Sequence, residues 1–93
     1  MNEEYTIIRQ MLIDWLDDNY HFGDAEEMIC DDEMSFMDNA ILDSLGFVQL
    51  ILYLENNFNI RLERKDLSRT NFDGMNKIIS YITSHKDYNG LSS

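Results

Sequence analysis

Apolar residues recur at steps of three and four in three separate stretches of this 93-residue sequence, and this spacing constrains its fold most strongly. It places each apolar set on one side of an α-helix, so we expect amphipathic helices over residues 3–18, 43–57 and 75–85. A short fourth helix is expected within residues 65–72. No stretch keeps the two-residue alternation of a half-buried strand. The sequence therefore predicts an all-α fold, a small four-helix bundle of three main helices plus one short helix.

The pattern dissolves between the first and second helices. Residues 19–42 mix acidic and apolar side chains without a period, which predicts a long loop whose apolar residues enter the core, with at most one short helical turn. A chain of this length supports one small domain. We expect that domain to span residues 1–86, followed by a frayed tail over residues 87–93.

Charge is strongly acidic and unevenly placed. Seven Lys and Arg face eighteen Asp and Glu, which gives a net charge of −11 and disfavours binding to nucleic acids or to anionic membrane surfaces. Twelve acids and no Lys or Arg lie between Gln10 and Ile60. Two interpretations stay open: a solvated acidic surface that maintains solubility, or a surface that steers a basic partner.

The sequence shows no recognisable targeting signal. No basic segment is followed by an apolar one, so no signal peptide is expected. The longest apolar run, residues 50–54, is too short to cross a bilayer, which needs about 20 residues. We expect a cytoplasmic protein that is not inserted in a membrane, and a monomer.

Cysteine and histidine offer little chemistry. The single cysteine, Cys30, cannot form an internal disulfide or a two-cysteine metal site, and we expect it to be a small packed residue. His21 and His85 have no Cys or His at ligand spacing, so no metal site is expected. Trp15 falls on the apolar side of the first helix and is expected to anchor the core. No paired nucleophile and base can be assembled, so we expect no enzyme.

Ser44 is the strongest candidate for a functional residue. It lies at the start of the second main helix, where free backbone N–H groups and the positive end of the helix dipole favour a covalently attached phosphate. The structural alternative is that Ser44 or Asp43 only caps the helix. Leu45, Val48 and Leu52 lie outside the core side of this helix, near Ser44. They either pack under the long loop or form an exposed docking patch.

Two segments carry a family resemblance. Residues 42–50, LDSLGFVQL, resemble the phosphopantetheine attachment motif of acyl and peptidyl carrier proteins. Within that superfamily the sequence is most similar to the D-alanyl carrier proteins of teichoic-acid modification. Their later pattern R-x-x-W-D-x-x-N-K-I is similar to residues 69–78, RTNFDGMNKI, at the same distance from the serine. Phe72 stands where that family has Trp, and Met75 where it has Pro.

The resemblance implies an acyl-carrier-like fold and a carrier function. Ser44 would accept 4'-phosphopantetheine from coenzyme A, supported by Asp43, and the attached thiol would hold an acyl or aminoacyl group as a thioester. The implied partners are a phosphopantetheinyl transferase, an adenylating acyl or aminoacyl ligase, and a downstream enzyme that receives the group. The patch of Leu45, Val48 and Leu52 would dock them. Two alternatives stay open: a fatty-acid or polyketide-type acyl carrier, or a non-modified helical adaptor that binds a partner through its apolar patch.

Overall fold

The computed structural model describes residues 3–21 and 23–90, and every regular element in these two stretches is helical. The prediction of an all-α fold is therefore confirmed. In chain order the helical elements are α1 (Glu3–Leu16), a π-helical turn (Asp17–His21), α2 (Ala25–Met28), α3 (Ser44–Phe58), a 3-10 turn (Arg64–Asp66), α4 (Arg69–Phe72) and α5 (Met75–Ser84).

The three main helices and the short fourth helix appear where the apolar spacing places them. α1, α3 and α5 are the long elements, and α4 is the short helix expected before the last one. The four-residue helix α2 lies inside the predicted long loop, for which the sequence allows one short helical turn. A hydrogen bond from the Ala25 N–H to Asp17 Oδ1 (2.8 Å) joins the start of α2 to the end of the π-helical turn. The connection is thus more ordered than its irregular sequence indicates.

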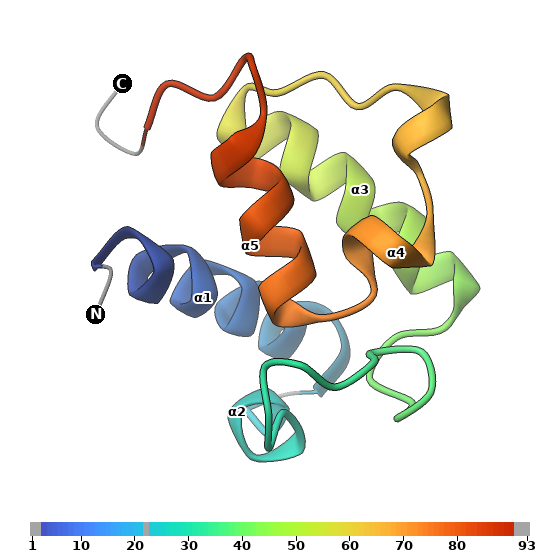
Figure 1. Cartoon of the computed structure of the whole chain (residues 1–93). Coiled ribbons are helices and arrows are strands. Elements are labelled where there is room, and N and C mark those ends of the chain that lie inside the picture. Colours follow the sequence, from blue (N-terminus) through green and yellow to red (C-terminus); the bar gives the residue numbers. More distant parts are fainter. Residues whose placement is uncertain (1–2, 22, 91–93) are drawn as a thin grey trace.

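The core lies between α1, α3 and α5, and Figure 1 shows α5 lying beside α1 and α4. α3 contributes Leu50, Ile51, Leu54 and Phe58 to this core, while Phe47 is half-buried. Leu54 is fully buried. Burial of these apolar sides is the main stabilising term for helices of this length, which are marginal in isolation. The buried residues of the other two long helices are Ile8, Leu12, Ile13, Leu16, Met75, Ile78, Ile79 and Ile82.

The segment between α2 and α3 passes below α4 and α5 in Figure 1 before it reaches the start of α3. Its apolar residues Ile29, Phe36, Ile41 and Leu42 are buried, as expected for a loop that packs into the core. The segment therefore has a defined shape although it lacks a regular helix.

Two single residues differ in their surroundings from what their sequence context suggests. Cys30 is exposed, so the prediction of a packed cysteine is wrong. The buried position is taken by its neighbour Ile29, and the chain then turns Cys30 outward. Trp15 is half-buried, with its ring centroid 5.5 Å from that of Tyr20 and 5.3 Å from that of Tyr53. It packs against the edge of the core and does not lie at its centre.

The C-terminal segment after α5 still contacts the bundle at Tyr88. Tyr88 is half-buried, its ring lies 6.5 Å from that of Phe58, and its hydroxyl donates to Glu4 (2.5 Å). Residues 91–93 of the predicted tail lie outside the described residues. Within the described part of the chain, no helix has the length and apolar character needed to cross a bilayer.

Candidate functional site

Ser44 is the first residue of α3, and its side chain is exposed. The preceding residue, Asp43, has an extended backbone (φ −97°, ψ −175°) and caps the helix. Its Oδ1 accepts a hydrogen bond from the Gly46 N–H at 2.7 Å, and its carbonyl oxygen accepts one from the Phe47 N–H at 2.9 Å. The cap is therefore Asp43, and the start of the helix does not depend on the Ser44 hydroxyl.

Gly46 allows the start of α3 to pack closely against the residues that precede it. A Cβ atom at this position would lie 2.9 Å from Leu42 Cδ2 and 3.2 Å from Asp43 Oδ1. Any other residue would displace the cap or the buried Leu42, so glycine holds the start of α3 against the loop that precedes it.

A hollow of about 460 Å³ opens beside Ser44. Its floor and walls come from the end of the long connection and from the π-helical turn after α1. Among the described residues that line it, Asp43 alone has a carboxylate or a cationic group. The lining residues are Tyr20, Met37, Ala40, Ile41, Leu42, Asp43 and Ser44.

Tyr20 closes one side of this hollow. Its hydroxyl donates to the side-chain oxygen of Gln49 on α3. Burial raises the pKa of the Tyr20 phenol, and the nearby negative charge of Asp43 raises it further. The phenol is therefore neutral at physiological pH and stays a hydrogen-bond donor beside Ser44.

The three apolar residues that flank Ser44 on α3 are exposed. Leu45, Val48 and Leu52 keep 66%, 56% and 54% of their accessible surface. At about 100° per residue they share one side of α3, away from its buried side. The interpretation that they pack under the loop is therefore wrong, and they form an apolar patch on the surface.

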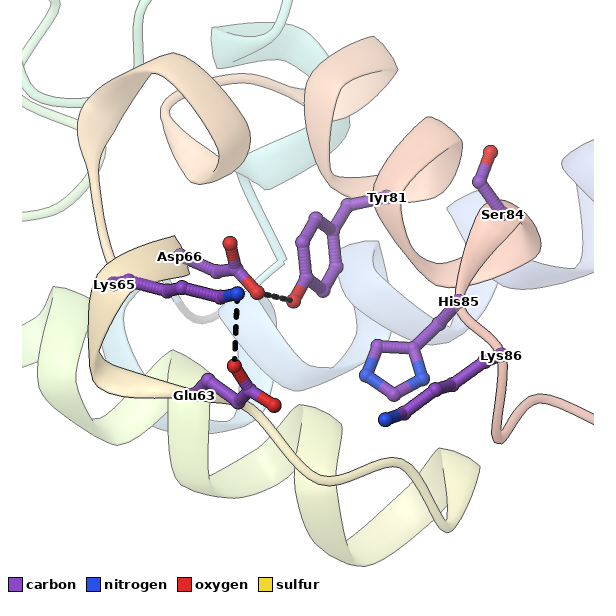
Figure 2. Close-up of a pocket in the computed structure, with 7 residues that line it drawn as sticks. All are labelled: Glu63, Lys65, Asp66, Tyr81, Ser84, His85 and Lys86. Atoms are coloured by element: carbon purple, nitrogen blue, oxygen red, sulfur yellow. Dashed lines mark hydrogen bonds and ion pairs between the residues drawn. The ribbon is translucent and has the colours of Figure 1, made fainter.

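A second hollow, of about 370 Å³, lies between the 3-10 turn and the end of α5 (Figure 2). Tyr81 donates to Asp66 Oδ2 at 3.0 Å, and Lys65 pairs with Glu63 at 3.4 Å. Burial, followed by the hydrogen bond to Asp66, raises the pKa of Tyr81 to about 12. The polar groups here pair mainly with one another, and none of the lining residues is shared with the hollow at Ser44.

Two further observations concern groups that can carry charge. Among the described residues, no three His, Cys, Asp or Glu side chains lie close enough to hold a metal ion, and the side chain of His21 is outside that description. Asp73 comes two residues before α5 but does not cap it: Gly74 occupies the N-cap position and Asp73 is buried. It pairs with Arg69, and the spacing of four residues between the two is the sequence signal of this ion pair.

Comparison with known proteins assigns the chain to a family. No protein-family model and no solved structure matches it. It is 36% identical over 63 residues to the D-alanyl carrier protein of Streptococcus sanguinis strain SK36, covering 62% of this chain and 80% of that protein. It is 34% identical over 79 residues to that of Streptococcus pyogenes serotype M5, covering 85% and 89%. These relatives and the helical fold define a carrier protein. The chain belongs to the D-alanyl carrier protein family.

Proposed function

We propose that this chain carries an acyl or aminoacyl group on a 4'-phosphopantetheine arm attached to the Ser44 hydroxyl. The proposal rests on one observation: at the start of α3, one residue caps the helix and a different residue presents the hydroxyl. Asp43 caps the helix, and the exposed Ser44 hydroxyl remains available beside the hollow. The names of the relatives make a D-alanyl group the first candidate for the cargo.

The residues around Ser44 suit a phosphodiester at this position. The first turn of α3 presents backbone N–H groups and the positive end of the helix dipole, which stabilise an anion. The neutral phenol of Tyr20 adds no negative charge beside this position. Met37 and Ile41 give the hollow apolar surface against which part of a flexible chain can lie. When bound, the arm supplies the thiol on which the cargo is held as a thioester.

Attachment requires a separate enzyme. The Ser44 oxygen forms a bond to the phosphorus atom that bears pantetheine, the bond from that phosphorus to the 3',5'-ADP part of coenzyme A breaks, and the hydroxyl proton passes to a base. The described lining of the hollow offers only the Asp43 carboxylate as a charged group, and that group is engaged in the cap. A phosphopantetheinyl transferase therefore supplies the base, and this protein is a substrate and not an enzyme.

The apolar patch of Leu45, Val48 and Leu52 is the proposed docking surface for partner enzymes. Its position beside Ser44 on one side of α3 supports this role, since a partner that reaches the arm must approach this side. The partners are the transferase, an adenylating ligase that loads the cargo, and a downstream enzyme that receives it. We further propose that the protein works as a monomer in the cytoplasm, where coenzyme A and ATP are available to these partners.

Incubation with coenzyme A and a promiscuous phosphopantetheinyl transferase tests the proposal. The intact mass should rise by one phosphopantetheine group. Ser44→Ala should keep the fold and accept nothing, while Ser80→Ala, at an exposed serine of α5, should be modified like the wild type. Modification of Ser44→Ala would contradict the attachment site. An unmodified wild type would contradict the carrier function and favour the helical adaptor.

The cargo needs its own measurement. The modified protein should be loaded with D-alanine by a ligase that adenylates this amino acid. Transfer of a fatty acyl group by a fatty-acid ligase, with no loading of D-alanine, would favour the fatty-acid or polyketide-type carrier.

A further inference from the structure

The carboxylate of Asp73 lies buried between α4 and α5 and is only 2% exposed. It accepts hydrogen bonds from Ser35 Oγ at 2.5 Å and from the Met37 N–H at 2.9 Å. It also accepts two from Arg69, through Nε at 2.9 Å and Nη2 at 2.7 Å. A charge out of water is costly unless it is paired and hydrogen-bonded, and here both conditions hold. The carboxylate therefore joins α4 to the loop that leads to Ser44.

Arg69 extends the same network. Its Nη2 also donates to Ser35 Oγ at 3.0 Å and to Asp38 Oδ1 at 2.8 Å, and Ser35 Oγ accepts from the Asp38 N–H at 2.9 Å. We call the set of Ser35, Met37, Asp38, Arg69 and Asp73 the Asp73 clamp. It connects two segments that lie more than thirty residues apart in the sequence.

The clamp continues into the wall of the hollow beside Ser44. The Phe36 carbonyl, between two members of the clamp, accepts from the Ile41 N–H at 2.8 Å and from the Leu42 N–H at 3.3 Å. Ala40 has a left-handed backbone (φ 59°), which is unfavourable for alanine and persists only where the surroundings impose it. Met37 and residues 40–42 line the hollow. The wall of the hollow is therefore held in place through the hydrogen bonds that the Asp73 carboxylate accepts.

A second and separate attachment holds the same loop further upstream. Asp32 accepts from Arg9 Nε at 3.0 Å and from the Tyr5 hydroxyl at 2.6 Å, and its carbonyl oxygen accepts from the Asn76 N–H at 3.0 Å. Gly74 (φ 151°) permits the close approach, since a Cβ there would lie 3.0 Å from the Met34 carbonyl oxygen. None of the groups at Asp32 lines the hollow, so this attachment provides a matched control.

We propose that Asp73 is a positioning residue for the modification of Ser44: it holds residues 37–42 in the shape that the phosphopantetheinyl transferase recognises beside the hydroxyl. The inference rests on the proposed function. Asp73 touches no reacting atom and acts through the loop. Its loss should therefore weaken recognition of the carrier more than it slows the chemical step on a carrier that is correctly bound.

The test compares the kinetics of phosphopantetheine transfer to Asp73→Asn and Asp32→Asn, with coenzyme A and the same transferase. Both variants remove one charge from a polar attachment of the same loop. The temperature is chosen so that circular dichroism shows each variant to be folded. Asp73→Asn should raise the KM for the carrier by about tenfold or more and change kcat by less than about threefold. Asp32→Asn should change both constants by less than about threefold.

Ser35→Ala is the second variant, in case Asp73→Asn does not fold. Ser35 is half-buried and lies outside any helix, and its loss removes one donor to Asp73. It should raise the KM by about threefold to tenfold. An unchanged KM in folded Asp73→Asn, or in Ser35→Ala if the first variant unfolds, would overturn the inference, as would equal effects of Asp73→Asn and Asp32→Asn. A wild type that accepts no group overturns the proposed function itself, and the inference with it.

Discussion

The loop before Ser44 and the helix after it are held in place by different kinds of contact. α3 is fixed by apolar burial of residues such as Leu50 and Leu54. The end of the loop depends on hydrogen bonds and charges that converge on Asp73. The stabilisation from apolar burial is non-directional and does not depend on pH. A network of charged hydrogen bonds requires each partner to have the correct ionisation state and the correct geometry. The two sides of the candidate site should therefore respond to different perturbations.

Leu54→Ala should have the largest effect on the helix side. Leu54 is fully buried, and removing its side chain should lower the free energy of unfolding by about 2–5 kcal/mol. Leu52→Ala, two residues away and 54% exposed, should change it by less than about 0.5 kcal/mol. Urea unfolding followed by circular dichroism measures both. Equal losses would mean that α3 is not fixed by its buried side.

Acid should weaken the loop side in particular. Burial alone would raise the pKa of Asp73, but hydrogen bonds from Ser35, Met37 and Arg69 outweigh it and hold the pKa below its ordinary value of 3.8. A lowered pKa in the folded state gives stability that is present above the unfolded value and is lost as pH falls through the folded one. The stability difference between wild type and Asp73→Asn should thus be full at pH 7 and shrink below about pH 4.

Urea midpoints from pH 7 downward check this dependence. Leu54→Ala, which removes no ionisable group, is the control. Its difference from the wild type should not show the same loss with acid. A difference for Asp73→Asn that stays constant with pH would mean that its carboxylate charge does not stabilise the fold.

Val48→Asp should have the smallest effect on stability and a clear effect on loading. Val48 is 56% exposed, so the free energy of unfolding should change by less than about 0.5 kcal/mol. A charge in the proposed docking surface should slow loading by the cognate ligase. Ser80→Asp, with the same charge on α5, should be loaded normally. Normal loading of folded Val48→Asp would exclude this surface, and unfolding would assign Val48 to the core.

The periodicity of the sequence predicts the helix that follows Ser44 but not the contacts that hold the loop before it. The steps of three and four indicate the three long helices, the buried side of α3 and the position of Ser44 at its start. They also separate Leu45, Val48 and Leu52 from the core. All of these depend on neighbours within a few turns of helix, where sequence spacing and spatial spacing coincide.

The Asp73 clamp could not be predicted in the same way. Asp73 precedes a glycine and a helix, so its local sequence favours a cap. Two of its partners, Ser35 and Met37, lie 38 and 36 residues away, and no period connects them to it. The role of some of the acidic residues between Gln10 and Ile60 is also hidden from the local sequence, because their partners lie far away in the chain. Asp32 is engaged by Arg9 and Tyr5, so part of the charge that suggests a solvated surface is used inside the fold.

The division of roles between Asp43 and Ser44 implies two kinds of mutational tolerance at adjacent positions. For the helix, position 43 requires a short side chain with an acceptor oxygen, which Asn, Ser or Thr also provide, so several substitutions should preserve the fold. The helix requires no particular side chain at position 44, and under the proposed function only a hydroxyl remains useful there. Substitutions at position 43 within this small chemical class should therefore keep the protein folded, while a change at position 44 should leave a stable protein that has lost its task.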